Sequence, residues 1–164
     1  MAPKVYVASP LGFTPAGRRY NGEEVKPALV AAGLEVVDPW VLAPDVDAAL
    51  AAALARPDGP ERRGALTAVD RDIGEANARL IHGADGMLAV LDGTDVDSGT
   101  ASEIGFASAL GKRIVGLRTD FRPAGDNDGV IVNLQVEHFV HATGGPIVAD
   151  LAEAVRALAG LLGV

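Results

Sequence analysis

Residues 85–91 read Asp-Gly-Met-Leu-Ala-Val-Leu, a short and almost continuous apolar run. Runs of this kind are typical of a central strand in a parallel sheet, because helices cover both faces of such a strand. The run lies between two segments with helical spacing of apolar residues, 67–82 and 100–110, and each segment is followed by a glycine. A further strand is predicted over residues 113–117.

The N-terminal part of the chain repeats this alternation. Residues 4–9 predict a strand, residues 16–32 a helix that ends before Gly33, and residues 34–37 a second strand. This unit of about 35 residues has the usual size of a right-handed parallel crossover. The sequence therefore predicts an α/β fold: a single doubly wound, flavodoxin- or Rossmann-like domain over residues 1–164, with four or five parallel strands.

Three segments carry weaker patterns. Residues 41–64 contain three prolines and an alanine run, which predict a short helix and a mobile connection, or alternatively a flap over a pocket. Residues 130–140 fit either a strand or a helix. Residues 147–162 predict a final amphipathic helix.

The composition excludes several classes of function. The net charge of −8 argues against binding of a nucleic acid polymer, which needs a basic surface. The chain has no cysteine, so disulfides, thiolate metal sites and a cysteine nucleophile are excluded. The apolar runs fall short of the ~18 residues that span a membrane, and the first strand begins too early for a signal peptide. We therefore expect a cytoplasmic protein.

In doubly wound sheets the ligand binds beyond the strand ends where the strand order reverses. Here that crevice is expected between the strands at 4–9 and 85–91, which directs attention to loops 9–15 and 92–99. Residues 80–111 contain no Lys or Arg but five acids: Asp85, Asp92, Asp95, Asp97 and Glu103. Such a pocket suits a neutral ligand rich in N–H and O–H donors, such as a nucleoside, and would repel phosphate unless Arg18, Arg19 or helix amides compensated.

Glu103 has two interpretations. Thr100 and Glu103 have the spacing of a capping box, which would give both a structural role. A carboxylate in the first turn of a helix is also held in its ionised form, and at a ligand crevice it can attack a sugar carbon. A calcium loop is excluded, because Gly99 would occupy a ligand position without a side-chain oxygen, and no metal site is expected.

The sequence D-S-G-T-A-S-E-I-G (97–105), followed by A-S-A-L-G-K (107–112), resembles the signature of the nucleoside 2-deoxyribosyltransferase family. The segments V-Y-V-A-S-P (5–10) and L-E-V-V-D-P-W (34–40) are similar to the first two strands of that family. The resemblance spans roughly residues 4–140, and it implies substrates that are purine or pyrimidine 2-deoxyribonucleosides and free nucleobases, with no cofactor.

The resemblance also implies roles for single residues. Glu103 matches the nucleophile, Asp97 an aspartate that contacts the nucleobase, and Tyr6 a tyrosine that orients the nucleophile. Asp72 matches a second base-contacting acid that protonates the leaving base, although Asp70 lies close enough in sequence to take this role instead.

Four further residues are expected to contact substrate. Ser9, Ser98 and Gly99 are interpreted as substrate-binding residues of the two loops. Asn133 resembles an asparagine that reaches into the site of a neighbouring subunit and contacts the sugar. The resemblance therefore implies a homo-oligomer, at least a dimer, with a shared active site.

Three functions remain open from the sequence. The first is transfer of 2-deoxyribose between bases in nucleoside salvage, by a ping-pong, retaining mechanism through a covalent glycosyl-Glu103 intermediate. The second is an N-glycosidase for nucleosides or their 5′-monophosphates, since the N-terminus of the helix at 98–100 could hold a phosphate. The third is a non-catalytic nucleoside-binding domain, in which Glu103 only caps a helix.

Overall fold

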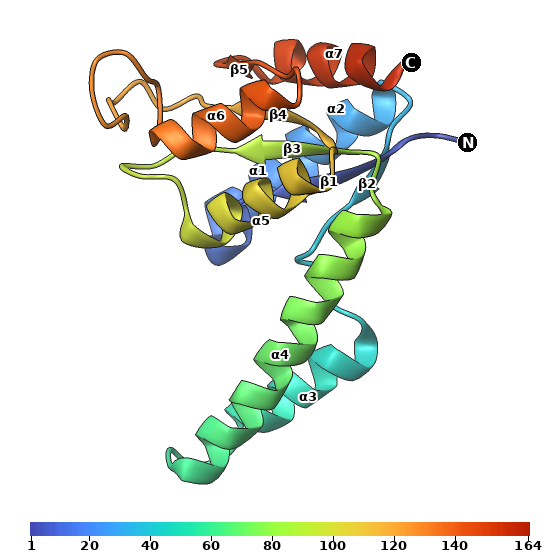
Figure 1. Cartoon of the computed structure of the whole chain (residues 1–164). Helices are drawn as coiled ribbons and strands as arrows, with labels where there is room; N and C mark the ends of the chain where they lie inside the picture. The colour runs from blue at the N-terminus through green and yellow to red at the C-terminus, as the bar shows by residue number, and fades with distance from the viewer.

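A computed structural model describes residues 1–164 and contains one parallel sheet of five strands in the order β2-β1-β3-β4-β5 (Figure 1). The predicted doubly wound, flavodoxin-like α/β fold is confirmed, with the upper of the two expected strand numbers. Residues 86–90 form the central strand and are buried throughout, as their apolar run predicted. The strands are β1 (Lys4–Ala8), β2 (Glu35–Val37), β3 (Gly86–Val90), β4 (Arg113–Leu117) and β5 (Ile147–Val148).

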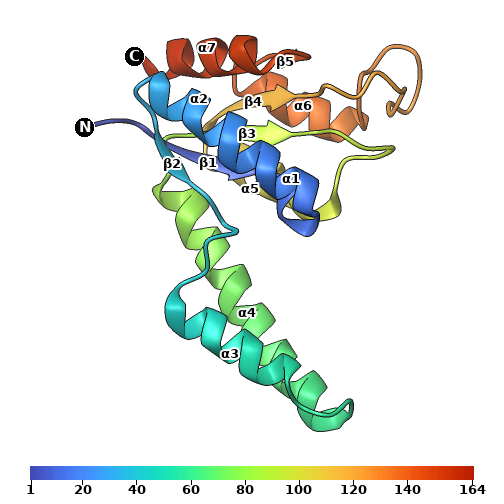
Figure 2. The same ribbon diagram turned by 180° about the vertical axis from the view of Figure 1, so that it is seen from behind.

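Helices cover both faces of the sheet, so the aliphatic core is divided into two layers (Figure 2). On one face, Leu29 and Leu158 pack in the same cluster as Val7 and Leu88. This layer is formed by α1 (Pro15–Tyr20), a π-helical stretch (Asn21–Val25), α2 (Lys26–Ala31) and α7 (Leu151–Leu162). The opposite layer is formed by α5 (Ser98–Ala109), α6 (Leu134–Ala142) and the C-terminal end of α4 (Pro60–Gly83).

The C-terminal part of the chain differs from the expectation in two places. Residues 147–148 pair with β4 as a short strand, so the helix predicted from residue 147 begins only at Leu151, where Asp150 caps it by accepting a hydrogen bond from the Glu153 N–H. The ambiguous segment 130–140 forms a loop and then α6, because Asn133 caps the helix that starts at Leu134. Local capping thus sets both helix starts.

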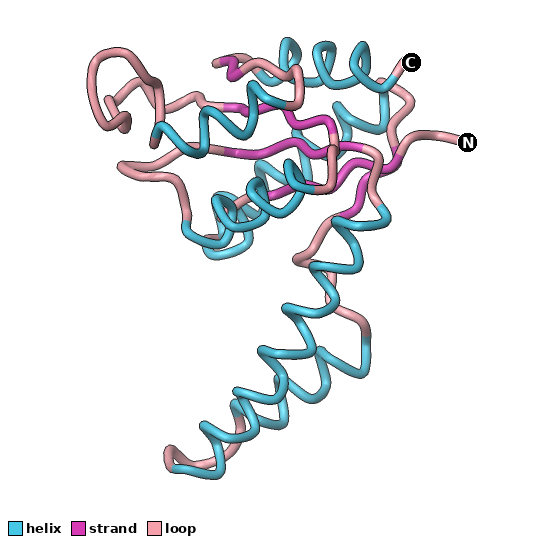
Figure 3. Tube along the Cα trace, viewed as in Figure 1, coloured by secondary structure: helices cyan, strands magenta, loops and turns pink.

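Residues 44–83 form a helical hairpin that projects away from the sheet, as the tube in Figure 3 shows. The helix predicted within 41–64 is confirmed as α3 (Pro44–Leu54). The rest of that segment was predicted as a connection, but α4 already begins at Pro60, seven residues before the predicted start at 67. Proline is well suited to the first turn of a helix, which explains this start. None of the helices combines the length and the apolar composition that crossing a bilayer requires.

Candidate active site

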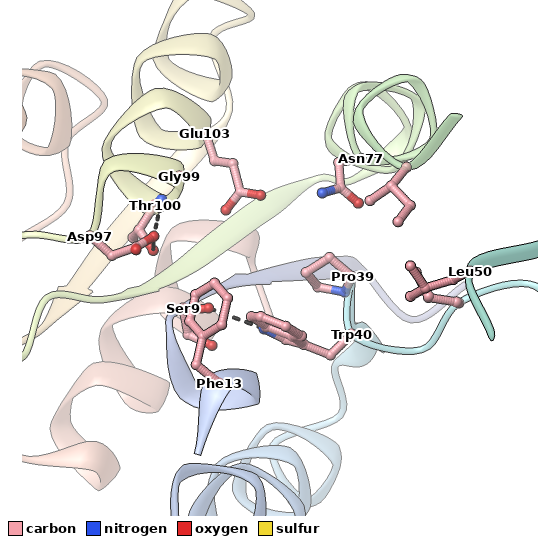
Figure 4. Close-up of a pocket in the computed structure, with 12 residues that line it drawn as sticks. Ser9, Phe13, Pro39, Trp40, Leu50, Asn77, Asp97, Gly99, Thr100 and Glu103 are labelled. Carbon is pink, nitrogen blue, oxygen red and sulfur yellow. Dashed lines mark hydrogen bonds between the residues drawn. The ribbon is translucent and has the colours of Figure 1, made fainter. Parts of the chain in front are cut away.

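A cavity of about 350 Å³ lies where the sheet meets the α3–α4 hairpin. It opens beyond the C-terminal ends of β1 and β3, which is the crevice expected from the reversal of strand order. None of the side chains that line it is a lysine or an arginine. The lining residues are Ser9, Phe13, Pro39, Trp40, Leu42, Leu50, Ile73, Asn77, Asp97, Gly99, Thr100 and Glu103 (Figure 4).

Glu103 is held by a tyrosine that lies beneath it in the sheet. The hydroxyl of Tyr6, which is fully buried on β1, donates a hydrogen bond of 2.6 Å to Oε1 of Glu103 on α5. Burial raises the pKa of Glu103, the Tyr6 hydrogen bond lowers it, and the nearby charge of Asp97 raises it again. Burial and the charge of Glu103 raise the pKa of Tyr6, so the tyrosine remains a proton donor. Oε2 of Glu103 has no hydrogen-bond partner within the chain, and the Glu103 side chain lines the cavity (Figure 4).

Asp97, and not Thr100, is the N-cap of α5. Its Oδ2 accepts hydrogen bonds from the Thr100 N–H at 2.9 Å and from the Thr100 hydroxyl at 3.2 Å. The proposed capping box of Thr100 and Glu103 is therefore wrong, because the helix begins two residues earlier at Ser98. Glu103 is free for its contact with Tyr6. The second oxygen of Asp97 has no hydrogen-bond partner within the chain and belongs to the cavity wall.

Two aromatic side chains form the opposite wall of the cavity (Figure 4). The indole Nε1 of Trp40 donates a hydrogen bond of 3.1 Å to the Ser9 carbonyl, and the backbone N–H of Trp40 donates to Asp38 at 3.0 Å. Phe13 packs edge-on against the Trp40 ring at a centroid distance of 4.7 Å. These contacts fix an aromatic surface on which a planar ring can stack.

Gly12 lets the indole ring approach the backbone, which leads to a testable prediction. A Cβ at this position would lie 1.9 Å from Cδ2 of Trp40, so Gly12→Ala must displace the pinned ring. We expect the substitution to lower the free energy of unfolding by about 1–3 kcal/mol, the usual cost of overpacking, and to weaken ligand binding. Chemical denaturation and the fluorescence of Trp40, the only tryptophan, measure the two effects.

Gly22→Ala is the matched control, because a Cβ there meets nothing within 4 Å. A Gly12→Ala protein with the stability and the Trp40 emission of the Gly22→Ala protein would contradict the prediction.

The structure places Asp72 outside the cavity and brings Asn77 into it. Both residues lie on α4, but five residues of helix rotate their side chains about 140° apart, so Asp72 is exposed on another face. Asp70 lies on the face of Asn77, but it is exposed about two turns away towards the tip of the hairpin and does not line the cavity. The expectation of a second acid from this helix is therefore not met within this chain.

Asn77 was not expected at the site, because the resemblance implied an aspartate on this helix and only Asp70 and Asp72 fit that role. The available signal was a polar amide beside Ala76, within the apolar stripe that also contains Ile73 and Leu80. Trp40 and Phe13 were also not assigned a role. Their place in the cavity depends on loops that follow different strands, and the spacing in the sequence does not show this.

The expected substrate-binding residues are divided between the cavity and its surroundings. Ser9 and Gly99 line the cavity, and the buried hydroxyl of Ser9 has no hydrogen-bond partner. Ser98 is exposed at the start of α5 and is not among the lining residues. Asn133 is also outside the lining and accepts hydrogen bonds from two backbone N–H groups at the start of α6.

Most of the acidic residues in segment 80–111, which contains no Lys or Arg, have hydrogen-bond partners within the chain. Asp85, Asp92 and Asp95 each accept hydrogen bonds from backbone N–H groups of this chain. Only Asp97 and Glu103 line the cavity. The carboxylate cluster expected from the sequence is therefore a pair.

Arg118, a basic residue outside segment 80–111, stabilises the loop after β3. The Arg118 side chain, at the end of β4, is buried and donates hydrogen bonds to the carbonyls of Leu91, Gly93 and Arg122. Segment 80–111 therefore has a basic side chain in contact with it in the folded protein, although it contains none in its sequence. Arg118 is not part of the cavity wall.

The comparisons with known proteins agree with this geometry. A sequence model of the family described as nucleoside 2-deoxyribosyltransferase matches residues 5–139. No match is found among curated proteins. A conserved protein from Enterococcus faecalis V583 is 21% identical over 96% of this chain and 98% of its own, with a TM-score of 0.68.

Two other solved structures have named activities. A 2-desoxiribosyltransferase from Leishmania mexicana is 23% identical over 96% of this chain and 97% of its own, with a TM-score of 0.61. A CMP N-glycosidase from Clostridium botulinum is 17% identical over 98% of both chains, with a TM-score of 0.52. At these identities the likeness shows a shared fold, and both a transferase and a glycosidase have it.

Proposed function

The chain belongs to the nucleoside 2-deoxyribosyltransferase family, and from this premise we propose that it transfers the 2-deoxyribosyl group between nucleobases through a covalent glycosyl-Glu103 intermediate. The observation that carries the proposal is the Tyr6–Glu103 pair, which presents a half-buried carboxylate to a cavity with an aromatic wall. A helix cap would not need this arrangement, and α5 is capped by Asp97 instead.

The first half-reaction breaks the N-glycosidic bond. A carboxylate oxygen of Glu103 forms a bond to C1′ of the sugar while the bond from C1′ to the base nitrogen breaks, and its electron pair stays on the base. The carboxylate stabilises the oxocarbenium character that develops at C1′. The departing base takes up a proton from the carboxyl group of Asp97, the other acid that lines the cavity, which becomes a carboxylate.

The second half-reaction restores the enzyme. A nitrogen of a different base attacks C1′, returns its proton to the carboxylate of Asp97, and displaces Glu103 as a carboxylate. Two displacements at the same carbon give retention of configuration and ping-pong kinetics. The aromatic wall of Trp40 and Phe13 supports the proposal, because it offers a stacking surface to the outgoing and the incoming base.

The charge of the cavity favours an unphosphorylated nucleoside. Its wall holds two acids and no lysine or arginine, so the dianion of a 5′-monophosphate would meet repulsion without a cationic partner. The exposed N-terminus of α5, with Gly99 in the wall, favours the alternative function of a nucleotide N-glycosidase. In that reaction water, instead of a second base, would resolve the glycosyl-enzyme.

A shared site between subunits is part of the proposal. Asn133 lies at the exposed start of α6 and not in the cavity of its own chain. Exposed apolar side chains, Ile131 and Leu134, flank it. We therefore infer that this end of α6 meets the cavity of a second copy, and that a fully active monomer would rule this out.

The activity assay separates the open functions. We expect the protein, incubated with 2′-deoxyadenosine, 2′-deoxyinosine or thymidine and an unlike free base, to form the corresponding new nucleoside, as followed by chromatography. Release of the base at the same rate without an acceptor would identify a hydrolase instead. A protein that leaves deoxynucleosides, ribonucleosides and their 5′-monophosphates unchanged would be a non-catalytic binding domain.

A further inference from the structure

Asn77 presents an unused amide to the cavity. It lies half-buried on α4, and neither its Nδ2 nor its Oδ1 forms a hydrogen bond within the chain. Figure 4 shows Asn77 and Glu103, from different helices, directed into the same space beside the ring of Trp40. We propose that Asn77 recognises the edge of the nucleobase and selects 6-aminopurines over 6-oxopurines. The inference rests on the proposed function, because it assigns the substrate class of that same site.

The chemistry of the wall gives Asn77 this role. Only two of its side chains carry N–H groups, and that of Trp40 already donates to the Ser9 carbonyl. Asp97 and Glu103 are hydrogen-bond acceptors when ionised. The amide of Asn77 is therefore the one free side-chain N–H donor in the cavity wall, and the other unpartnered donor is the hydroxyl of Ser9, whose carbonyl holds Trp40 on the opposite wall.

A departing purine gains negative charge on its ring nitrogens. A donor placed at N7 binds this charge more strongly in the transition state than in the ground state, and such differential binding accelerates the reaction. We therefore place Nδ2 of Asn77 at N7 of the purine. Its Oδ1 then faces the substituent at C6, because the amide presents its donor and its acceptor side by side.

The substituent at C6 decides the selectivity. A 6-amino group donates to Oδ1 and completes a bidentate pair, which is the arrangement that asparagine forms with the N6 and N7 atoms of adenine. A 6-oxo group instead places a carbonyl oxygen next to Oδ1, and two acceptors cannot form a hydrogen bond with each other. Rotating the amide of Asn77 by 180° does not remove the mismatch. N7 and O6 of a 6-oxopurine are both acceptors, whereas Asn77 has a single donor group, Nδ2.

Binding of 9-methylated bases tests the inference without catalysis, since these compounds carry no sugar. The fluorescence of Trp40 reports binding in the wild-type protein, in Asn77→Leu and in Asn77→Asp. We expect the wild type to bind 9-methyladenine about tenfold more tightly than 9-methylhypoxanthine or 9-methyl-7-deazaadenine, and Asn77→Leu to bind the three compounds alike. Asp72→Asn, an exposed change on the same helix, should keep the wild-type preference.

The aspartate variant separates recognition from a merely structural role. Its ionised carboxylate has no donor for N7, so binding of 9-methyladenine should fall at pH 8 and recover as the pH is lowered to about 4, where the protonated acid donates again. Wild-type protein that binds the three purines equally, or none of them, overturns the inference, as does a preference that survives in Asn77→Leu. A protein that shows the preference but transfers no sugar would uphold Asn77 and refute the transferase proposal. A protein that transfers the sugar but shows no preference among the purines would uphold the transferase proposal and refute the role of Asn77.

Discussion

Glu103→Gln is expected to lose transferase activity by on the order of 10³-fold or more, the scale of effect seen when a nucleophile is removed. An amide oxygen is a far weaker nucleophile than a carboxylate, and it cannot form the glycosyl ester on which the second half-reaction depends. The variant keeps the shape of the side chain and can still accept a hydrogen bond from the Tyr6 hydroxyl. The exchange assay with two unlike bases measures the loss.

Intact-protein mass spectrometry gives a second readout of the same residue. Wild-type protein mixed with a deoxynucleoside, without an acceptor base, should gain the mass of one deoxyribosyl group, and Glu103→Gln should gain none. A variant that retains full activity or forms the adduct would remove Glu103 from the role of nucleophile.

The stability of Glu103→Gln relative to the wild type should depend on pH in a predictable direction, and this serves as the folding control. Because burial raises the pKa of Glu103 in the folded state, the folded protein loses stability as the pH rises from the pKa of the unfolded chain through the folded value. The neutral glutamine avoids this loss. Glu103→Gln should therefore be at least as stable as the wild type at pH 7, with little difference well below pH 4. A large fall in its Tm at pH 7 would mean that the activity loss reflects unfolding.

Tyr6→Phe is expected to reduce kcat by about 10- to 100-fold, the equivalent of the 1.5–3 kcal/mol of a hydrogen bond to a charged group. The hydroxyl donates to Oε1 of Glu103 at 2.6 Å and lowers the pKa of that carboxyl. Without it, the carboxylate is less well oriented and its pKa rises. Since the nucleophile must be ionised, the acid limb of the pH–rate profile should move to higher pH.

The profile of kcat against pH measures this shift, and the direction is its diagnostic part. A merely structural change would lower the rate at all pH values and leave the limb in place. An acid limb that stays fixed or moves to lower pH would contradict the assigned contact. Phe13→Leu is the control. It alters the aromatic wall and not the Tyr6–Glu103 hydrogen bond, so the acid limb of its pH–rate profile should stay where it is in the wild type.

The sheet could be predicted from the sequence because its signals are local. The run at 85–91 and the strand–helix–strand unit at 4–37 both led to strands in the observed order. The two-residue strand β5 could not be predicted in this way, because it exists only through its pairing with Gly116 and Leu117 of β4. The start of α5 was also misplaced, since Asp97 and Thr100 each have a side chain that can cap a helix.

The sequence by itself determined the fold class and the family, because these depend on apolar periodicity and on a motif within one continuous segment. The role of Tyr6 beside Glu103 was implied only by the resemblance, because the two residues are 97 positions apart in the chain. Only the tertiary structure decided which residues surround that pair. The rotation of α4 brings Asn77 into the cavity and leaves Asp72 exposed, and a pinned Trp40 closes the opposite side. Side-chain direction depends on helix register and on packing between distant segments, and a list of residues along the chain does not specify either.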